Sequence, residues 1–321
     1  MTRRFLALAS LLLLTFVFSG CSLFRKDAAP DPLSHIVFEP GTTHRYALVL
    51  DQKDNRVIFG KANPIETLQE FETSWRVREV AENGNAVIDV AVEAYKLSRQ
   101  MPDGSVVTFD SYTDTIPESG LVAGFAAISG GRVSLTVSPR REIIGIEGAE
   151  SLLASMLEAL GGDTVANQPI SDTIKEYYSA PTFTALLATV LPPAPPKGIA
   201  GDWVGRRVVA SSYSVVSEEA YNTAETENGE PVIEALGALV SDFSVKKGST
   251  REEKVNYELL GQTEGRFVLD PESGWLKSAT FTGSGDGQLV FIGDFDSTNF
   301  PAMPTQINVS ITAERLDATP Q

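Results

Sequence analysis

Cys21 is the only cysteine among the 321 residues, and its sulfur is the candidate site of a covalent modification. Residues 5–18 form an uncharged, apolar stretch that follows two arginines, and Ser19 and Gly20 then supply small side chains. A positive start, a short apolar segment and a small-residue cleavage site are typical of a secretory signal peptide. The apolar stretch is shorter than the ~20 residues of a spanning helix. We therefore predict a signal peptide over residues 1–20, cleaved between Gly20 and Cys21.

A cysteine directly after small residues resembles the lipobox of bacterial lipoproteins, although Phe18 stands where an aliphatic residue is usual. The resemblance implies a diacylglyceryl group on the Cys21 sulfur and three acyl chains in the mature protein, which is enough for stable anchoring in a membrane. Ser22 implies, by resemblance to enterobacterial sorting, the outer membrane of the bacterial cell envelope, facing the periplasm. An ordinary cleaved signal with a chance cysteine is the alternative.

The composition narrows the classes of partner. The net charge of the chain is −16, and loss of the two signal arginines would take it to −18. A strongly acidic domain repels phosphate backbones, so we predict no nucleic-acid partner. Apolar residues make up 42% of the chain, which is enough for a substantial core. With Cys21 used for the lipid, no internal disulfide is possible, so stability has to come from burial.

No catalytic or zinc-binding constellation stands out in the sequence. Of the two histidines, His35 lies in the predicted tether and His44 at the start of a predicted strand, and neither offers a suitable base for a serine nucleophile. No Gly-x-Ser-x-Gly elbow occurs. We predict no catalytic residue, no cofactor and no enzymatic activity. An unrecognised enzyme that uses scattered carboxylates ranks last among the alternatives.

Asp294 and Asp296 are weak candidates for a metal site. Residues 294–299 space their oxygen ligands like half of a calcium loop, but the turn glycine is missing and Thr305 stands where a bidentate glutamate is expected. A polar loop at a strand end is the alternative. The glycine-rich residues 283–287 lack the lysine of a phosphate-binding loop, and we interpret them as a flexible hairpin turn between two strands.

Three glutamates and three tryptophans are better explained by structure than by chemistry. Glu66, Glu70 and Glu72 could be imagined as catalytic carboxylates, but alternation with Phe71 and Thr73 places Glu70 and Glu72 on the solvent-facing side of a strand. Each tryptophan lies at or beside a predicted strand start, so we expect core positions rather than a ligand groove for Trp75, Trp203 and Trp275.

Composition shifts along the chain predict its organisation. Residues 21–42 carry charges, prolines and Gly41 and are interpreted as a lipidated tether. A strand-rich half with helices follows over residues 43–191. The Pro-rich residues 192–201 form an extended connector, or a surface loop within one domain. A second strand-rich half covers residues 202–317.

Period-two alternation predicts most of the strands. Residues 68–97 indicate a hairpin around Asn83 and Gly84. An earlier pair, over 44–50 and 55–60, would flank a turn at Asp54 and Asn55. Further strands are predicted over residues 132–137, 142–146, 254–259, 267–269, 276–282, 289–295 and 307–312.

Helical spacing predicts a group of helices in the middle of the chain. Leu152, Met156 and Leu160 share one face, and Gly161 follows as a C-cap. Further helices are expected over 171–178, 181–191 and 118–128. The predicted fold is therefore α+β: mostly antiparallel strands in a curved sheet or half-barrel, packed on a central group of helices.

The order of turns and tryptophans resembles a family of bacterial lipoproteins catalogued only as a domain of unknown function. The resemblance covers most of residues 44–313 and rests on the lipobox, on Gly201-Asp202-Trp203 after the prolines and on Gly274-Trp275-Leu276. It implies an envelope location and a strand-rich fold, and no reaction.

The expected function is binding by a non-enzymatic envelope lipoprotein, with an apolar ligand inside the curve or a protein partner on its rim. The alternative is a structural scaffold with a filled core. A concave apolar pocket of ~300 Å³ or more would favour the ligand, and side chains that fill the curve would favour the scaffold.

Overall fold

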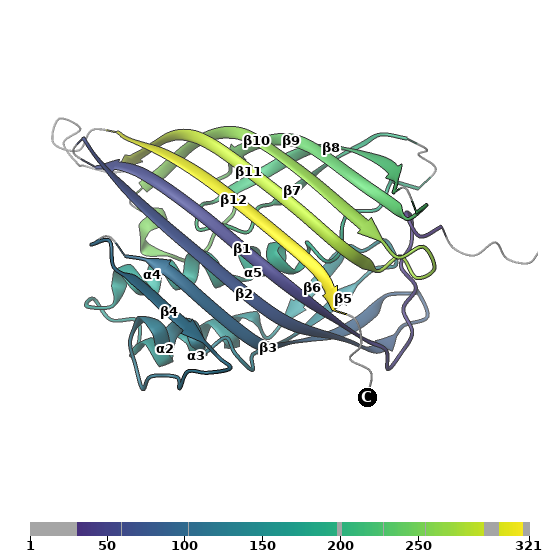
Figure 1. The fold of residues 1–321 in the computed structure, drawn as a ribbon, viewed down its shortest axis with the longest axis horizontal. Coiled ribbons are helices and arrows are strands. Elements are labelled where there is room, and N and C mark those ends of the chain that lie inside the picture. The colour runs from purple at the N-terminus through teal and green to yellow at the C-terminus, as the bar shows by residue number, and fades with distance from the viewer. Residues whose placement is uncertain are drawn as a thin grey trace, which may run out of the picture. The chain divides into compact units, whose positions relative to one another are not determined.

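The computed structural model describes residues 31–316, except 59, 102, 198–200, 227, 254 and 292–301. The described residues form one antiparallel sheet of 12 strands in the order β6-β5-β3-β2-β1-β12-β11-β10-β9-β8-β7, with β4 paired to β3 (Figure 1). Strands of the two predicted halves meet where β1 pairs with β12. The strands are β1 (Thr43–Ile58), β2 (Lys61–Val80), β3 (Ala86–Gln100), β4 (Val106–Asp110), β5 (Arg132–Val137), β6 (Ile143–Glu147), β7 (Trp203–Val208), β8 (Val215–Glu225), β9 (Pro231–Ser241), β10 (Val255–Leu269), β11 (Leu276–Phe291) and β12 (Met303–Leu316).

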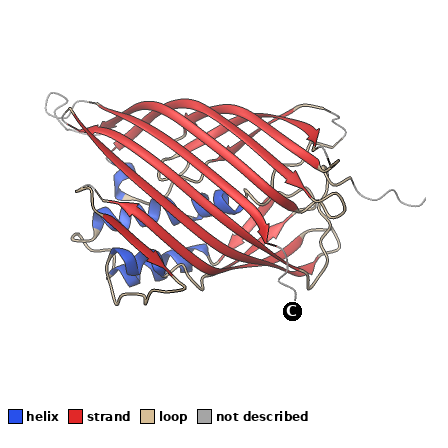
Figure 2. Cartoon of the chain, viewed as in Figure 1, coloured by secondary structure: helices blue, strands red, loops and turns tan. Residues whose placement is uncertain are grey.

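The predicted α+β class, with its central group of helices, is wrong. The fold is mostly antiparallel β, and the helices are short pieces of 6 to 12 residues beside a large open sheet (Figure 2). The error arose because strands β8 and β9 were not predicted, and because β1, β10 and β11 are much longer than their sequence patterns suggested. The helices are α2 (Leu121–Ala126), α3 (Ala149–Leu160), α4 (Gln168–Tyr178) and α5 (Ala180–Leu187), with a short 3₁₀ helix η1 (Thr250–Glu253).

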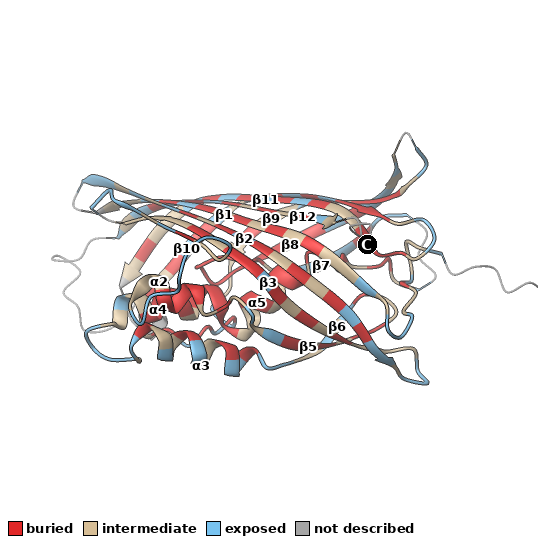
Figure 3. Ribbon diagram, turned by 60° about the horizontal axis from the view of Figure 1, so that its bottom comes forward, coloured by how far each residue is buried: buried red, intermediate tan, exposed pale blue. Residues whose placement is uncertain are grey.

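Alternation of apolar and polar residues shapes the sheet as predicted. Along β2, Phe71, Trp75 and Val77 are buried, whereas Arg76 and Arg78 are exposed. The hairpin expected over residues 68–97 is confirmed by the pairing of β2 with β3. The strands therefore carry alternating buried and solvent-facing residues (Figure 3), as expected for an antiparallel sheet with one wet face.

Two predicted turns are continuous strand instead. No turn occurs at Asp54 and Asn55, because β1 runs from Thr43 to Ile58 and pairs with β2 along its whole length. Residues 283–287 lie within β11, paired to β10 on one side and to β12 on the other. In both places, polar or small side chains were taken for turn signals, although neighbouring strands satisfy the backbone.

The glycines of β10 and β11 allow two strands to approach closely. A Cβ atom at Gly261 would overlap the carbonyl oxygen of Ser284, and one at Gly287 would overlap the carbonyl oxygen of Glu258. Glycine is required wherever another backbone comes this near. The glycine-rich run is therefore a packing feature of the sheet.

The short helices were predicted well. Helix α3 ends at Gly161, whose left-handed conformation and N–H bond to the carbonyl of Glu158 form the expected C-cap. Helix α4 covers the helix predicted over 171–178, and α2 lies within residues 118–128. Helix α5 overlaps the prediction over 181–191 but ends four residues earlier, at Leu187. Helix α5 contacts both edge strands of the sheet, β6 and β7.

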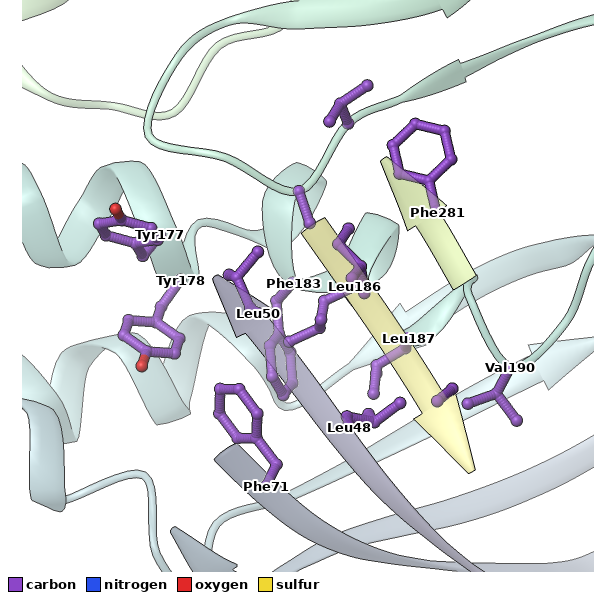
Figure 4. Packing of buried hydrophobic residues seen from close by; sticks show 14 of the residues in the cluster. Leu48, Leu50, Phe71, Tyr177, Tyr178, Phe183, Leu186, Leu187, Val190 and Phe281 are labelled. Atoms are coloured by element: carbon purple, nitrogen blue, oxygen red, sulfur yellow. The ribbon is translucent and has the colours of Figure 1, made fainter. Parts of the chain in front are cut away.

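Helix side chains fill the inner side of the sheet. Phe183, Leu186 and Leu187 of α5 pack towards Leu48 and Phe71 of the strands (Figure 4). All five belong to one buried apolar cluster. At ~25 cal/mol per Å² of buried apolar surface, such a cluster is the main source of folding free energy in a chain without internal disulfides.

The end of the predicted tether is attached to the folded body. Ile36 is buried and its N–H donates to the carbonyl of Pro139 at 2.8 Å. The guanidinium of Arg141 donates to the carbonyls of Pro32 (3.0 Å) and Pro192 (3.0 Å), so it joins this segment to the Pro-rich stretch. Only the part of the tether before Pro32 precedes these contacts.

Candidate functional site

The residues on which the sequence predicted chemistry lie outside the described part of the chain. These are the lipidation residue Cys21, the cleavage-site residue Gly20 and the weak metal candidates Asp294 and Asp296. Within the residues that the structure describes, no group of three or more His, Cys, Asp or Glu side chains is arranged to hold a metal ion. Among those same residues, the helices are too short or too polar to span a membrane.

The other sequence candidates take structural places. His35 is exposed, and His44 lies against Trp275. Glu70 is exposed on β2, as predicted, and Glu66 is exposed too, whereas Glu72 is half-buried and lies 3.2 Å from the guanidinium of Arg45. The three tryptophans are buried core residues, which confirms the structural interpretation of Trp75, Trp203 and Trp275.

A cavity of about 240 Å³ brings together charged side chains that are far apart in the sequence. It lies where the inner faces of β1, β2 and β3 meet α4 and the 3₁₀ helix η1. The side chains that line it are Asp54, Arg56, Asn63, Ile65, Arg99, Met101, Leu121, Pro169, Ile170, Thr173, Glu176, Tyr177, Ser212 and Arg251.

Strand β1 supplies the first ion pair of the cavity. Asp54 is buried and lies 3.5 Å from the guanidinium of Arg56, which also donates to the hydroxyl of Tyr213 at 3.1 Å. The amide of Gln52 donates to both Asp54 oxygens, at 2.9 and 3.1 Å, and to the hydroxyl of Ser212. Burial raises the pKa of Asp54, and Arg56 and Gln52 oppose that rise.

Helix α4 supplies the second ion pair. Glu176 is buried and accepts from the guanidinium of Arg251 at 2.9 Å and from the hydroxyl of Ser249 at 3.3 Å. Burial raises the pKa of Glu176, against the charge of Arg251. Asp172, one turn earlier, accepts from the backbone N–H of Thr250 at 2.8 Å and so fixes η1 against α4.

Arg99 of β3 is the third cation of the cavity. Its guanidinium donates to the hydroxyl of Thr67 at 2.6 Å, and no carboxylate of the described residues forms an ion pair with it. Tyr177 lines the same cavity, and burial raises the pKa of its phenol to about 12, so the phenol stays protonated at neutral pH. The cavity therefore presents guanidinium and hydroxyl donors together with two carboxylates that already have partners.

Larger cavities lie elsewhere. One of about 390 Å³ includes Asp51, Gln262 and Glu264 on the outer face of the sheet. Another of about 690 Å³ includes Glu230, Arg266 and Lys277. Both are lined mainly by polar and charged side chains, unlike the apolar pocket that a buried hydrophobic ligand requires.

None of the charged residues of the inner cavity was predicted as a site residue. Gln52, Asp54 and Arg56 have the same strand parity as the buried Leu48 and Leu50, so they continue the inward face of β1 as polar residues. This alternation was the sequence signal that could have shown that the three side chains face inward. Asp54 was assigned to a turn instead, which concealed its inward direction.

Comparison with known proteins places the chain in a family and adds no activity. No curated protein matches it. A lipovitellin structure, described by its lipid–protein interactions, aligns with a TM-score of 0.46 and 12% identity over 89% of this chain, which spans only 26% of that one. DynF from the dynemicin biosynthesis pathway of Micromonospora chersina (TM-score 0.20, 7% identity) covers 89% of this chain and 90% of its own.

The translocator domain of the autotransporter NalP from Neisseria meningitidis aligns with a TM-score of 0.21 and 8% identity, over 94% of this chain and 97% of its own. Such low scores and identities support no functional argument. The model of the family of unknown function DUF6263 matches residues 83–276, which is more than half of the chain. The chain therefore belongs to the family of unknown function DUF6263.

Proposed function

We propose that the protein is a non-enzymatic lipoprotein of the bacterial cell envelope that acts as a structural scaffold and contacts protein partners through its surface. The observation that carries this proposal is the filled inner side of the sheet. Phe183, Leu186 and Leu187 of α5 occupy the space that an apolar ligand would need next to Leu48 and Phe71 (Figure 4). With that apolar space occupied, a protein partner would be recognised at the surface.

The proposed anchor is a lipid on Cys21, with the protein on the outer membrane and facing the periplasm. Eleven positions separate Cys21 from Pro32, where contacts with the folded body begin. That length of chain would link the lipid to the folded body.

An enzymatic role has less support than binding. The two buried carboxylates of the inner cavity, Asp54 and Glu176, each have an arginine partner and a further hydrogen bond. Fully partnered ion pairs of this kind occur as structural networks, and a perturbed pKa alone does not define a catalytic group.

Labelling and fractionation test the anchor. Wild-type protein should take up a clickable fatty acid and sediment with membranes, whereas a Cys21→Ala variant should do neither. A Cys21→Ala protein that stays labelled and membrane-bound would remove the lipid anchor from the account.

Native mass spectrometry tests the mode of binding. Full-length protein extracted gently from the envelope should appear at its own mass, or in a complex with a protein of defined stoichiometry. A reproducible additional mass of lipid size on the Cys21→Ala form would contradict the proposal and favour a carrier of apolar ligands.

A further inference from the structure

We propose that the inner cavity is a binding site for a small anion with a carboxylate or phosphate group, held chiefly by Arg99. This inference goes beyond the proposed function, since it concerns a small molecule inside the sheet and not a partner on the surface. It rests on the charges, the hydrogen-bonding capacity and the size of the cavity.

The charges of the cavity do not cancel among its described residues. Three guanidinium groups line it, from Arg56, Arg99 and Arg251, against the two carboxylates of Asp54 and Glu176. Asp54 pairs with Arg56 and Glu176 pairs with Arg251, so the positive charge of Arg99 is not balanced by a carboxylate of the lining. An excess cation inside the cavity favours an anionic ligand at that place, against the long-range repulsion from a chain of net charge −16.

The guanidinium of Arg99 has more N–H donors than its bond to Thr67 uses. A guanidinium carries five N–H groups in a planar fork, and the hydroxyl of Thr67 accepts from only one terminal nitrogen of Arg99. Such a fork matches the two oxygens of a carboxylate or phosphate. The bond to Thr67 holds the side chain in place, so less conformational entropy is lost on binding.

Hydroxyl and apolar groups complete the site. Thr173, Tyr177 and Ser212 add hydroxyls to the lining, while Ile65 and Met101 add apolar surface that suits a short hydrocarbon portion. The first turn of α4 also borders the cavity, and its helix dipole places partial positive charge there.

The size limits the ligand. At about 240 Å³, the cavity has the volume of roughly eight water molecules, and it is smaller than the ~300–1,000 Å³ of sites for drug-sized molecules. Asn63, Arg99 and Arg251 are only half-buried, so solvent reaches the cavity. The ligand class is therefore a free phosphate, a short-chain carboxylate, or a headgroup of comparable size.

Isothermal titration calorimetry of the full-length protein in non-ionic detergent tests the site. The probes are sodium phosphate and sodium hexanoate in a chloride buffer of constant ionic strength, with hexanol as the neutral analogue of hexanoate. We expect saturable binding of one anion per chain and no binding of hexanol. Binding of phosphate alone would assign the site to phosphate groups, and binding of hexanoate would extend it to acyl carboxylates.

Substitutions locate the binding. Arg99→Gln should weaken the affinity at least tenfold, Arg99→Lys should retain part of it through its charge, and Arg76→Gln, on the exposed outer face, should leave it unchanged. If Arg99→Gln fails to fold, the wild-type titration and Arg99→Lys still decide. The proposal is overturned if wild-type protein binds neither anion, if hexanol binds as well as hexanoate, or if folded Arg99→Gln binds as tightly as wild type.

Discussion

The imidazole ring of His44 lies 4.3 Å from the indole ring of Trp275, with their planes inclined by 37°. His44 stands at the start of β1, and Trp275 follows the turn between β10 and β11. The indole N–H of Trp275 donates to the carbonyl of Val37 at 3.2 Å. This ring pair therefore joins the first strand, a late hairpin and the segment that enters the body from the tether.

The His44 contact makes stability depend on pH. Burial, and next the charge of Arg315, lower the pKa of His44 from 6.5 to about 4. Because the folded-state pKa lies below the unfolded one, the contribution is complete above pH 6.5 and is lost as pH falls towards 4. We expect about 1–2 kcal/mol of unfolding free energy to be lost between pH 7 and pH 5 in urea titrations.

Two substitutions isolate this effect. His44→Gln should remove most of the loss between pH 7 and pH 5, whereas His35→Gln, at the exposed histidine, should leave it unchanged. An equal pH dependence in wild type and His44→Gln would show that another group is responsible.

Asp270 should stabilise the neighbouring turn. Burial opposes ionisation, but the N–H of Ser273 and the guanidinium of Arg315 outweigh it and lower the pKa of Asp270 to about 2. A lowered carboxyl pKa stabilises the fold above the unfolded value of ~4 and ceases to do so as pH falls to about 2. Asp270→Asn should cost about 1–2 kcal/mol at pH 7, and this gap should close on acidification. Asp286→Asn, exposed on β11, is the matched control.

Gly261 is the sharpest steric test of the sheet. Alanine there would place its Cβ on the carbonyl oxygen of Ser284, so Gly261→Ala should lower the unfolding free energy by about 2–4 kcal/mol. Gly145→Ala should cost much less, because no atom lies closer than 4.0 Å to its Cβ position. Thermal and urea unfolding would measure both, and similar losses would refute the close approach of β10 and β11.

Arg141 should hold the entry segment and the Pro-rich stretch to the body. Its guanidinium donates to carbonyls of Pro32, Leu33 and Pro192, and its backbone has a φ of 66°. Arg141→Met should expose residues 32–38 to limited proteolysis and cost about 2–4 kcal/mol. Arg132→Met, at an exposed arginine, should change neither. Unaltered cleavage in Arg141→Met would mean that other contacts suffice.

Local patterns predicted the parts of the fold that depend on local physics. The hairpin of β2 and β3 and the helix that ends at Gly161 follow from alternation, turn residues and capping. The fold class and the lengths of the strands could not be predicted from local patterns, because strands such as β8 gain their stability from neighbouring strands on both sides. Residues 283–287 show the limit well: a flexible turn in isolation becomes strand when β10 and β12 flank it.

The candidate site could not be predicted for a related reason. Asp54, Arg99, Glu176 and Arg251 come from four distant parts of the chain and form a cavity only after β1, β3, α4 and η1 have packed. Each residue alone resembles an ordinary solvated charge. The alternation along β1 would have shown that Asp54 faces inward, but only if β1 had been predicted to continue beyond Asp54.

Hydrogen exchange of helix α5, followed by mass spectrometry, tests the filled interior most directly. If α5 is a permanent part of the core, amides of 183–188 should exchange about as slowly as those of the central strand β1. Phospholipid vesicles should leave that protection unchanged. Rapid exchange in α5 while β1 stays protected, or loss of α5 protection on addition of lipid, would contradict the account, because the inner face of the sheet would then open to an apolar ligand.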